Sequence, residues 1–328
     1  MKKTVLLLFL AGIYAETTGL GTSEIPLIPR SARQDALHPA IAVLFGKEAG
    51  DHTINPAYIS PDQKKAFIIS HIMPQIMGNI NDIETSLFIE STAVDIPINR
   101  YLAVGASALL SFLSKPSYNE IAEADGTYSE NNMCFSSAVR FTPMPREQTN
   151  KNFRMPLSLG GSASLYVSSV DRNRAYAALF SAGAGLNILR YIEIALSLRN
   201  AGTRLTYGSY KQASPFAIDF GFAYTLDKIP PLPIIIGFGL EYTYGLPLMM
   251  ALGLDASLNF KTGKQMFFQK FGFSLGYTID GKGEQPGNVS LHPWLLVKIK
   301  KTDLRISYTF RFRQHAGYNN TASLELRY

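Results

Sequence analysis

The sequence predicts an all-β fold, a 14-stranded antiparallel transmembrane β-barrel with a short N-terminal plug that contains brief helical turns. Charged residues are scarce, at 17% of the 328 residues, whereas an average soluble domain carries about 25%. Beyond the first 15 residues, no apolar run approaches the roughly 20 residues that a membrane-spanning helix requires. Low charge without long apolar runs indicates apolar residues spaced at a short period, as in strands that face lipid on one side.

Alternation of apolar and polar side chains is the clearest signal in the sequence. In 304–313 the apolar residues fall at every second position, at Leu304, Ile306, Tyr308, Phe310 and Phe312. Across the predicted strands the opposite face is mostly Gly, Ala and Ser. An outer-membrane barrel combines a lipid-facing apolar band with small or polar residues in a crowded lumen. The alternative is a large secreted β-sandwich, whose outward face would carry Lys, Glu and Thr more freely.

The N-terminus predicts export. Residues 1–15 read as a secretory signal peptide, because two lysines precede an apolar run that ends at Ala15. We expect cleavage after Ala15, or nearer Gly19 or Gly21. Cys134 is the only cysteine, so the fold is expected to form without an internal disulfide.

Residues 16–64 do not alternate and contain five prolines. A short apolar stretch, Ala40–Phe45, suits one or two helical turns. A polar, proline-rich segment before a barrel is either a plug inside the lumen or a periplasmic tail. We predict the plug.

Residues 65–328 form the predicted barrel. Its 14 predicted strands are 65–77, 82–91, 101–113, 131–141, 157–170, 176–188, 191–201, 213–226, 232–244, 248–261, 268–280, 289–300, 302–313 and 321–328. An even number of strands places both barrel ends on the periplasmic side. Pro74 removes a ladder hydrogen bond from the first strand, which indicates a kink, a lateral gap or simply the strand end.

The links between these strands are of two kinds. Short links predicted as periplasmic turns are 99–100, 188–191, 227–231 and 301–302. Longer polar links predicted as external loops are 114–130, 202–212 and 281–288. Segment 142–156 departs from the scheme, because it is long and basic where a short turn is expected.

The last residues, Leu324 to Tyr328, alternate up to a terminal aromatic residue. A final strand that ends in this way is a common recognition signal for barrel assembly machinery, so we expect that machinery to engage Tyr328.

Several motifs resemble the long-chain fatty-acid transporter (FadL) superfamily, which includes the PorV-like barrels and an uncharacterised spirochaete branch. In the plug they are Ser31-Ala32-Arg33, Ala40-Ile41 and Asn55-Pro56-Ala57, the last of which directly precedes the first strand. Later motifs are Leu198-Arg199-Asn200-Ala201-Gly202, Gly239-Leu240-Glu241-Tyr242 and Ser323-Leu324-Glu325-Leu326. The family's Gly-Gly step is replaced by His38-Pro39 and its acidic pair by Lys47-Glu48.

The resemblance implies a plugged barrel that passes fatty acids or other hydrophobic small molecules into the periplasm. It implies that Arg33, Asn55, Pro56 and Ala57 form the plug motif. It also leaves open a PorV-like docking or assembly component of a secretion or surface complex. A third alternative is a surface antigen or adhesin that acts through 114–130.

Alternation also predicts which charged residues face the lumen. They are Arg140, Glu193, Arg199, Asp219, Glu241, Arg305, Arg311 and Arg313, with Arg327 in the last strand. An arginine facing lipid at the bilayer midplane would cost about 2–4 kcal/mol. We expect these charges either to pair with one another and with the plug, or to bind the head group of an amphiphilic ligand.

Other function classes find no support in the sequence. The five histidines show no metal-ligand spacing, and no hydrolase or phosphate-binding motif is present. We therefore predict no enzyme activity, metal or cofactor. The net charge of +6 comes without a run of five basic residues, so no nucleic-acid binding is expected. The expected partners are outer-membrane lipids and a fatty acid-like hydrophobic molecule, bound by a monomer.

Overall fold

The computed structural model describes residues 26–46, 48–60, 64–76, 86–118, 124–143, 157–170, 173–188, 191–207, 210–226, 233–260, 268–280, 287–313 and 317–328. The predicted signal peptide, the turn 227–231 and most of the link 142–156 lie outside these residues.

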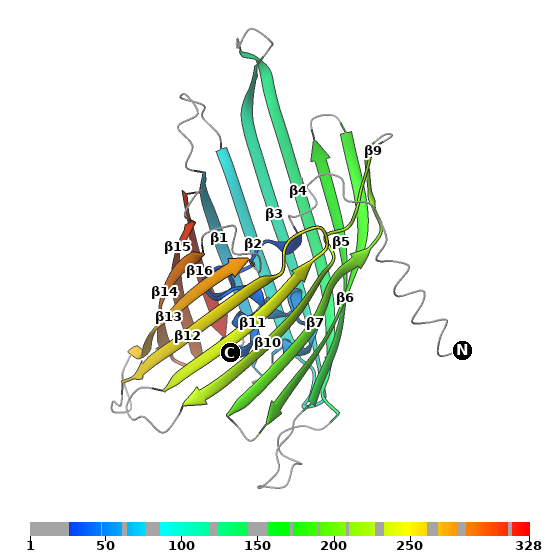
Figure 1. The fold of residues 1–328 in the computed structure, drawn as a ribbon. Coiled ribbons are helices and arrows are strands. Elements are labelled where there is room, and N and C mark those ends of the chain that lie inside the picture. Colours follow the sequence, from blue (N-terminus) through cyan, green and yellow to red (C-terminus); the bar gives the residue numbers. More distant parts are fainter. Residues whose placement is uncertain are drawn as a thin grey trace, which may run out of the picture.

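The 14-stranded antiparallel barrel is confirmed (Figure 1). Its strands are β1 (Ala66–Ile76), β2 (Ser86–Pro97), β3 (Leu102–Tyr118), β4 (Ala124–Phe141), β5 (Leu157–Val170), β6 (Asn173–Ile188), β7 (Ile192–Gly202), β10 (Ala217–Leu226), β11 (Ile234–Thr243), β12 (Met249–Asn259), β13 (Phe268–Asp280), β14 (Asn288–Ile299), β15 (Thr302–Arg313) and β16 (Gly317–Arg327). Each barrel strand pairs with the barrel strands before and after it in the chain.

The barrel closes between its first and last strands. β1 pairs with β16 from Ala66 opposite Arg327 to Ile76 opposite Gly317. Beyond this ladder, the Lys65 N–H donates to the Tyr328 carbonyl at 3.1 Å, and the Tyr328 N–H donates to the Lys65 carbonyl at 3.0 Å. We call the end of the barrel that holds Tyr328 the C-terminal rim.

Two segments predicted as external loops contain strands instead. In 114–130, β3 continues to Tyr118 and β4 begins at Ala124, which makes a long hairpin (Figure 1). In 202–212, β8 (Leu205–Tyr207) pairs with β9 (Tyr210–Gln212) in a separate two-stranded sheet. The first sequence is polar on both faces, so the alternation is lost although backbone pairing continues. In the second, Leu205 and Tyr207 share one face, and this run of three residues is too short to stand out as a strand.

The alternation seen in the sequence sets the two faces of the wall. On β7, β12 and β15 the outward residues Leu196, Leu252 and Phe312 are 53%, 55% and 60% exposed. Their inward neighbours Ser197 and Ala251 are buried. The outer surface of the barrel is therefore largely apolar, and the inner surface is small or polar.

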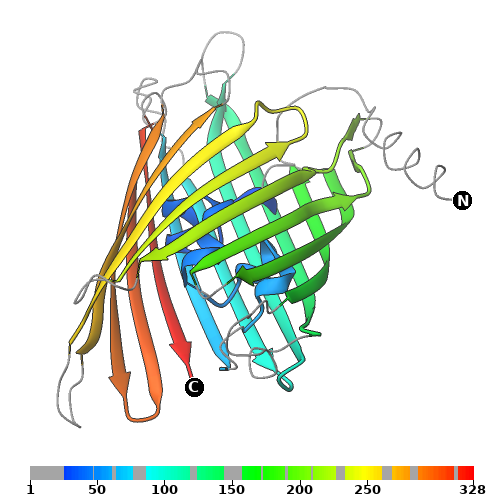
Figure 2. The ribbon, with the colours of Figure 1, turned by 60° about the horizontal axis from the view of Figure 1, so that its bottom comes forward.

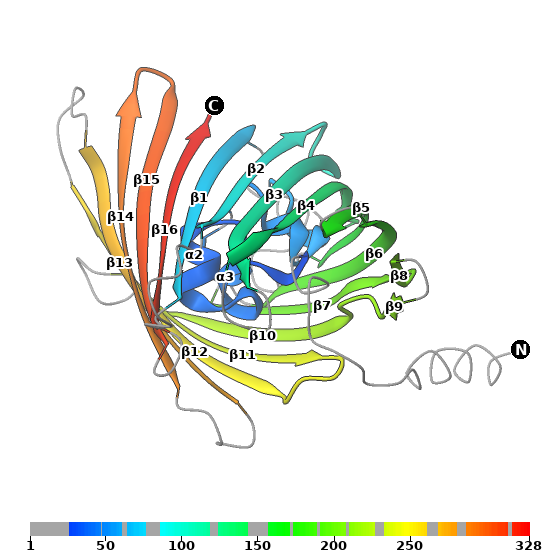
Figure 3. The ribbon, with the colours of Figure 1, turned by 90° about the horizontal axis from the view of Figure 1, so that it is seen from above.

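The N-terminal segment lies inside the lumen (Figures 2 and 3). Its elements are α2 (Ala32–Leu37), α3 (Pro39–Gly46) and the 3-10 turns η2 (Asp51–Thr53) and η3 (Pro56–Tyr58). Ser31 caps α2 by accepting a hydrogen bond from the Gln34 N–H at 3.3 Å. None of the helices in the described ranges is long and apolar enough to cross a membrane. The alternative of a periplasmic tail is thus wrong for residues 26–60, which we call the plug.

The plug packs across the lumen from one wall to the other. α2 contacts β12–β16, α3 contacts β7 and β10–β12, and η3 contacts β4–β6. Ile41, Leu44 and Phe45 of α3 pack with the small wall residues Ala195 and Ala223 in one buried cluster. The small side chains of the wall leave the volume that the apolar face of α3 fills.

Inward glycines let the plug backbone approach the wall closely. A Cβ atom added at Gly160 would lie 2.2 Å from the Pro56 carbonyl carbon. At Gly276 it would lie 2.0 Å from the Ala36 carbonyl oxygen. Ordinary carbon contacts are about 3.5–4 Å. Since the contacted atoms belong to the backbone, any larger residue would displace the plug.

We predict that Gly160→Ala loosens the plug around η3. Amide hydrogen exchange of residues 51–60 should become faster, because the added methyl group pushes the Pro56 backbone away from β5. Gly161→Ala is the matched control, since a Cβ atom at this neighbouring position meets nothing closer than 4.0 Å. Equal exchange rates in the two variants would contradict this account of the plug seat.

Candidate functional site

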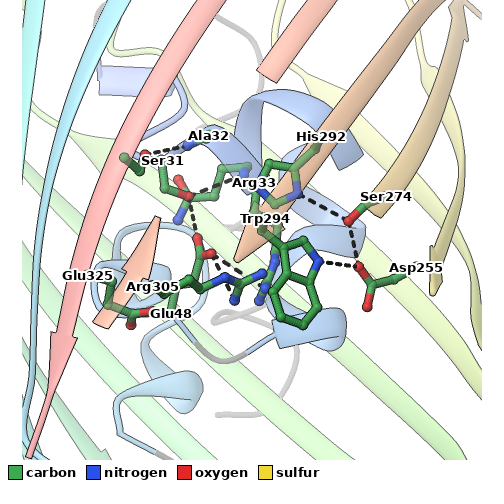
Figure 4. Close-up of polar contacts among 12 residues, drawn as sticks. Ser31, Ala32, Arg33, Glu48, Asp255, Ser274, His292, Trp294, Arg305 and Glu325 are labelled. Carbon is green, nitrogen blue, oxygen red and sulfur yellow. Dashed lines mark hydrogen bonds and ion pairs between the residues drawn. The ribbon is translucent and has the colours of Figure 1, made fainter. Parts of the chain in front are cut away.

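The candidate functional site is the interface between the plug and the inner wall. On the β14–β16 side, Glu48 of the plug lies between two guanidinium groups (Figure 4). Its Oε1 atom is 3.5 Å from Arg33 Nη2 and 3.2 Å from Nη1 of Arg305 on β15. Ser31 Oγ donates to Glu48 Oε2 at 2.7 Å. These four residues form the Glu48 cluster, which fixes the plug to the wall.

Two wall residues extend this cluster. Arg305 and Glu325 face each other across β15 and β16. Glu325 Oε1 accepts from the Ala49 N–H at 2.9 Å, and Arg327 Nη2 donates to Glu325 Oε2 at 3.0 Å. Arg305 also stacks over the Trp294 ring at 4.4 Å. The wall therefore holds the plug turn at 48–49 through both a cation and a carboxylate.

A buried row of polar groups lies beside Trp294. Ser274 Oγ donates to Asp255 Oδ1 at 2.5 Å and lies 3.1 Å from His292 Nδ1. The Trp294 indole also donates to Asp255, at 3.4 Å. In a Ser-His-Asp hydrolase the imidazole lies between the serine and the acid. Here the serine lies between the acid and the imidazole, an order that does not activate it as a nucleophile.

A second anchor, the Arg199 cluster, consists of Arg199, Asp219, Glu241 and His38. Arg199 on β7 binds Asp219 on β10 through Nε at 2.6 Å and Nη2 at 2.8 Å. The same Nη2 donates to Glu241 on β11 at 2.7 Å. His38 Nε2, at the junction of α2 and α3, lies 3.5 Å from Glu241 Oε2. Three adjacent strands thus hold one network that reaches the plug.

Two further contacts fix the first plug helix. Asp35 accepts from Arg311 Nη1 at 3.3 Å and from Thr321 Oγ1 at 2.9 Å. Thr309 Oγ1 donates to the Ala32 carbonyl at 2.5 Å. These bonds come from β15 and β16, so the same two strands hold both α2 and the Glu48 cluster.

The Asn-Pro-Ala motif is a fixed turn against the wall. Asn55 Oδ1 accepts from the Ala57 N–H at 3.0 Å and caps η3. Its Nδ2 donates to the carbonyls of Ala184 and Leu196, both at 3.2 Å. The motif therefore bonds to β6 and β7 as well as to itself.

Another buried pair lies between η2 and β2. His52 Nδ1 is 2.8 Å from Asp95 Oδ1, and Asp95 Oδ2 accepts from the Ser60 N–H at 3.2 Å. Asp95 thus holds both ends of the segment that contains the Asn-Pro-Ala motif.

Burial shifts the protonation of several plug groups. It raises the pKa of the Glu48 carboxyl, an effect that Arg33 opposes and Glu325 reinforces. It also raises the pKa of Asp51 well above its ordinary value. For His38, burial, followed by the charge of Arg311, lowers the pKa to about 3. His38 is therefore neutral at pH 7, and its contact with Glu241 joins a neutral imidazole to a carboxylate.

The structure places the sequence-predicted charges on the inner wall or against the plug. Arg199, Asp219 and Glu241 come together in one cluster, whereas Arg305 and Arg311 bind different plug acids. Of the remaining predicted residues, Arg140 is buried on β4 and Glu193 is partly buried on β7. Arg313 is in β15, with its side chain outside the described part of the structure.

Sequence reasoning did not identify Asp35, Glu325 or the His52–Asp95 pair as site residues. The inward phase of Glu325, in register with Arg305, was an available signal. Asp35 and His52 gave none, because the plug does not alternate. No group of three or more metal-ligating side chains occurs among the residues that the structure describes.

Comparison with known proteins supports the fold. No family model and no curated protein sequence matches the chain. The Ralstonia pickettii toluene transporter TbuX matches with a TM-score of 0.56 and 9% identity, over 91% of this chain and 97% of that chain. The Pseudomonas putida toluene transporter TodX matches with a TM-score of 0.53 and 8% identity, over 90% and 96%. This chain has their fold.

A Pseudomonas aeruginosa FadL homologue also matches, with a TM-score of 0.52 and 9% identity, over 95% of this chain and 98% of that chain. The 14-stranded barrel expected from the sequence is therefore a fold that these solved structures share. Identity this low extends the likeness to the fold alone.

We predict that Arg199→Ala destabilises the barrel by about 3–5 kcal/mol, because it leaves the buried Asp219 and the partly buried Glu241 side by side without their cation. Urea unfolding in detergent micelles measures the loss. Adding Asp219→Asn and Glu241→Gln to this variant should recover much of the stability, since both carboxylates are then neutral. Arg204→Ala, at an exposed position outside the cluster, is the control.

His38 should make stability depend on pH. Its folded-state pKa of about 3 lies below the ordinary value of 6.5. The unfolded chain therefore binds a proton that the folded chain cannot, and stability falls as the pH drops from about 6.5 toward 3. His38→Asn should flatten this slope while tolerating the positive φ of 68°. Identical slopes for the two proteins would show that His38 does not contribute.

Proposed function

We propose that the protein is a channel of the bacterial outer membrane that passes hydrophobic small molecules through its plugged barrel. The observation that carries the proposal is the match to TbuX, TodX and the FadL homologue over 96–98% of their lengths. TbuX and TodX are described as toluene transporters. For this chain, the proposed ligand class is fatty acids or similar apolar molecules.

The export and membrane placement belong to the same proposal. The large exposed apolar residues on the outer face of the barrel are suited to lipid. We infer that residues 1–15 are removed on export, that the C-terminal rim faces the periplasm, and that assembly machinery recognises Tyr328. The protein is proposed to work as a monomer.

A route for apolar molecules is proposed at the β1–β2 edge. β1 pairs with β16 as far as Ile76, but with β2 only as far as Ile72. If the β1–β2 register continued, residues 73–75 would lie opposite residues 86–88. The structure describes both segments, but no backbone pairing joins them. Pro74 lacks an N–H group and removes one ladder bond here. A molecule dissolved in the membrane could enter the lumen at this interruption.

The buried charges suit plug anchoring better than ligand binding. Arg199, Arg305 and Arg311 each bind a carboxylate, and the last two bind acids of the plug. The lumen residues Arg140, Glu193, Asp219, Glu241 and Arg313 remain candidate ligand contacts. Passage through the lumen then requires the plug to shift against these anchors.

A second candidate function is docking of a protein partner, or adhesion. It is favoured by the β3–β4 hairpin, in which β3 from Lys115 to Tyr118 pairs with β4 and with no other described residue. β4 pairs with β5 only from Glu130 onward. The hairpin therefore projects past both neighbouring strands (Figure 1).

Uptake into proteoliposomes tests the proposed function. Radiolabelled oleate and toluene should enter vesicles that contain the protein faster than empty vesicles, and glucose should not. Because a loosened plug opens the lumen, Gly160→Ala should increase the rate above that of Gly161→Ala. Uptake no faster than in empty vesicles, together with a protein that co-purifies in stable stoichiometry, would reject transport in favour of docking.

A further inference from the structure

Three buried serines of the inner wall are distinguished by the state of their hydroxyl groups. They are Ser91 on β2 and Ser107 and Ser111 on β3, with exposed fractions of 1%, 8% and 1%. Their hydroxyl oxygens make no hydrogen bond to any residue that the structure describes. We call these residues the serine triplet.

The triplet converges on one part of the lumen. Ser91 lies opposite Leu109 in the β2–β3 register, and Ser107 and Ser111 lie on either side of Leu109 along β3. Opposite residues of an antiparallel pair have Cβ atoms about 5 Å apart, and same-face neighbours along a strand are about 7 Å apart. The three hydroxyl groups therefore surround the Leu109 side chain.

One side of the triplet is apolar, whereas Ser70, Ser136 and Asn132 lie opposite Ser91, Ser107 and Ser111 on the neighbouring strands. Leu109 belongs to a buried cluster with Ile72, Ile89, Cys134 and Tyr166. This cluster lies next to the end of the β1–β2 pairing at Ile72, where we propose entry from the membrane. An apolar patch bordered by a few polar groups is the usual composition of a small-molecule site.

Cations are missing from this part of the wall. On β1 to β3, the buried inward residues that the structure describes include one charged side chain, Asp95, which is bound to His52 and Ser60. Farther from the C-terminal rim, Asn132 lies opposite Ser111 and donates to Glu130 at 2.7 Å. A carboxylate placed at the triplet would meet acids on both sides and no arginine or lysine from these positions.

Several other buried serines of the same wall are paired, whereas Ser168 on β5 resembles the triplet, because its hydroxyl oxygen makes no hydrogen bond among the described residues. Ser70 and Ser323 bond to each other at 2.7 Å, and Ser164 donates to Ser136 at 2.7 Å. Buried hydroxyl groups are nearly always hydrogen-bonded, because desolvation without a partner is costly. Three buried hydroxyl groups beside one apolar patch, all without a described partner, indicate that a bound ligand supplies their hydrogen bonds.

We infer that the serine triplet is the polar end of a binding site for neutral hydrophobic molecules that carry a hydroxyl group, such as alcohols and phenols. The inference rests on the proposed function and names its ligand class. A ligand hydroxyl donates to one serine and accepts from another, while its apolar part packs against Leu109 and Ile89. A plain hydrocarbon would leave the serines unpaired, and a carboxylate would meet no cation among the described buried residues of β1 to β3.

Three ligands with the same methylated ring test the inference: p-cresol, toluene and 4-methylbenzoate, measured by equilibrium dialysis at pH 7 in detergent. The variant combines Ser91→Ala, Ser107→Ala and Ser111→Ala. It should bind p-cresol about tenfold more weakly than the wild type, the range expected for one or two lost hydrogen bonds, with toluene affinity unchanged. The control is Ser181→Ala, which removes a buried hydroxyl group of β6 that accepts from the Asn200 N–H, and it should bind p-cresol normally.

Thermal unfolding separates binding from folding. The triple variant should be at least as stable as the wild type, because the hydroxyl groups that it lacks have no partner among the described residues, whereas the control should be less stable. A triple variant that loses stability, or unchanged p-cresol affinity, or tightest binding of 4-methylbenzoate, would overturn the inference alone. If no ligand binds and neither oleate nor toluene is taken up, the proposed function fails with it.

Discussion

Charge placed inside a closed barrel must be neutralised inside it, and this constraint explains most of the interior. The wall carries Arg199, Arg305 and Arg311 inward, where each is paired with a carboxylate. Two of those carboxylates, Glu48 and Asp35, belong to the plug. The plug therefore completes the electrostatics of the lumen as well as filling it. Removing one partner would leave a buried charge, which costs far more than the pair contributes.

The same lumen shows two different arrangements of polar groups. On the β7–β16 side, the hydroxyl and charged groups bond to the plug or to one another. On β2 and β3, the serine triplet faces apolar side chains and has no such partner among the described residues. Both sides of the lumen thus hold the plug, and the part that we infer to receive a molecule is the serine triplet of β2 and β3. This location is consistent with entry near the interrupted β1–β2 pairing.

The barrel was predictable from the sequence because the side chains of each strand alternate between apolar residues that face lipid and small or polar residues that face the lumen. The inward phase of Arg199, Asp219 and Arg305 followed from the same signal. The partners of these residues did not, because Asp35 and Glu48 lie in a segment that has no periodicity. Hairpin strands outside the apolar band, at 114–118 and 124–130, were missed for a related reason. Their side chains are polar on both faces, so nothing in the sequence marks the pairing that the backbone makes.

The bonds between Lys65 and Tyr328 have a consequence for the order of assembly. The plug precedes β1 in the chain, and the barrel closes only when β16, the last strand, pairs with β1. The wall cannot become a ring until the whole chain has been synthesised and delivered. The plug must occupy the lumen before that moment or enter afterwards through an open end. Because β15 and β16 supply Arg305, Arg311, Thr321 and Glu325, the strands that complete the ring are also those that secure its contents.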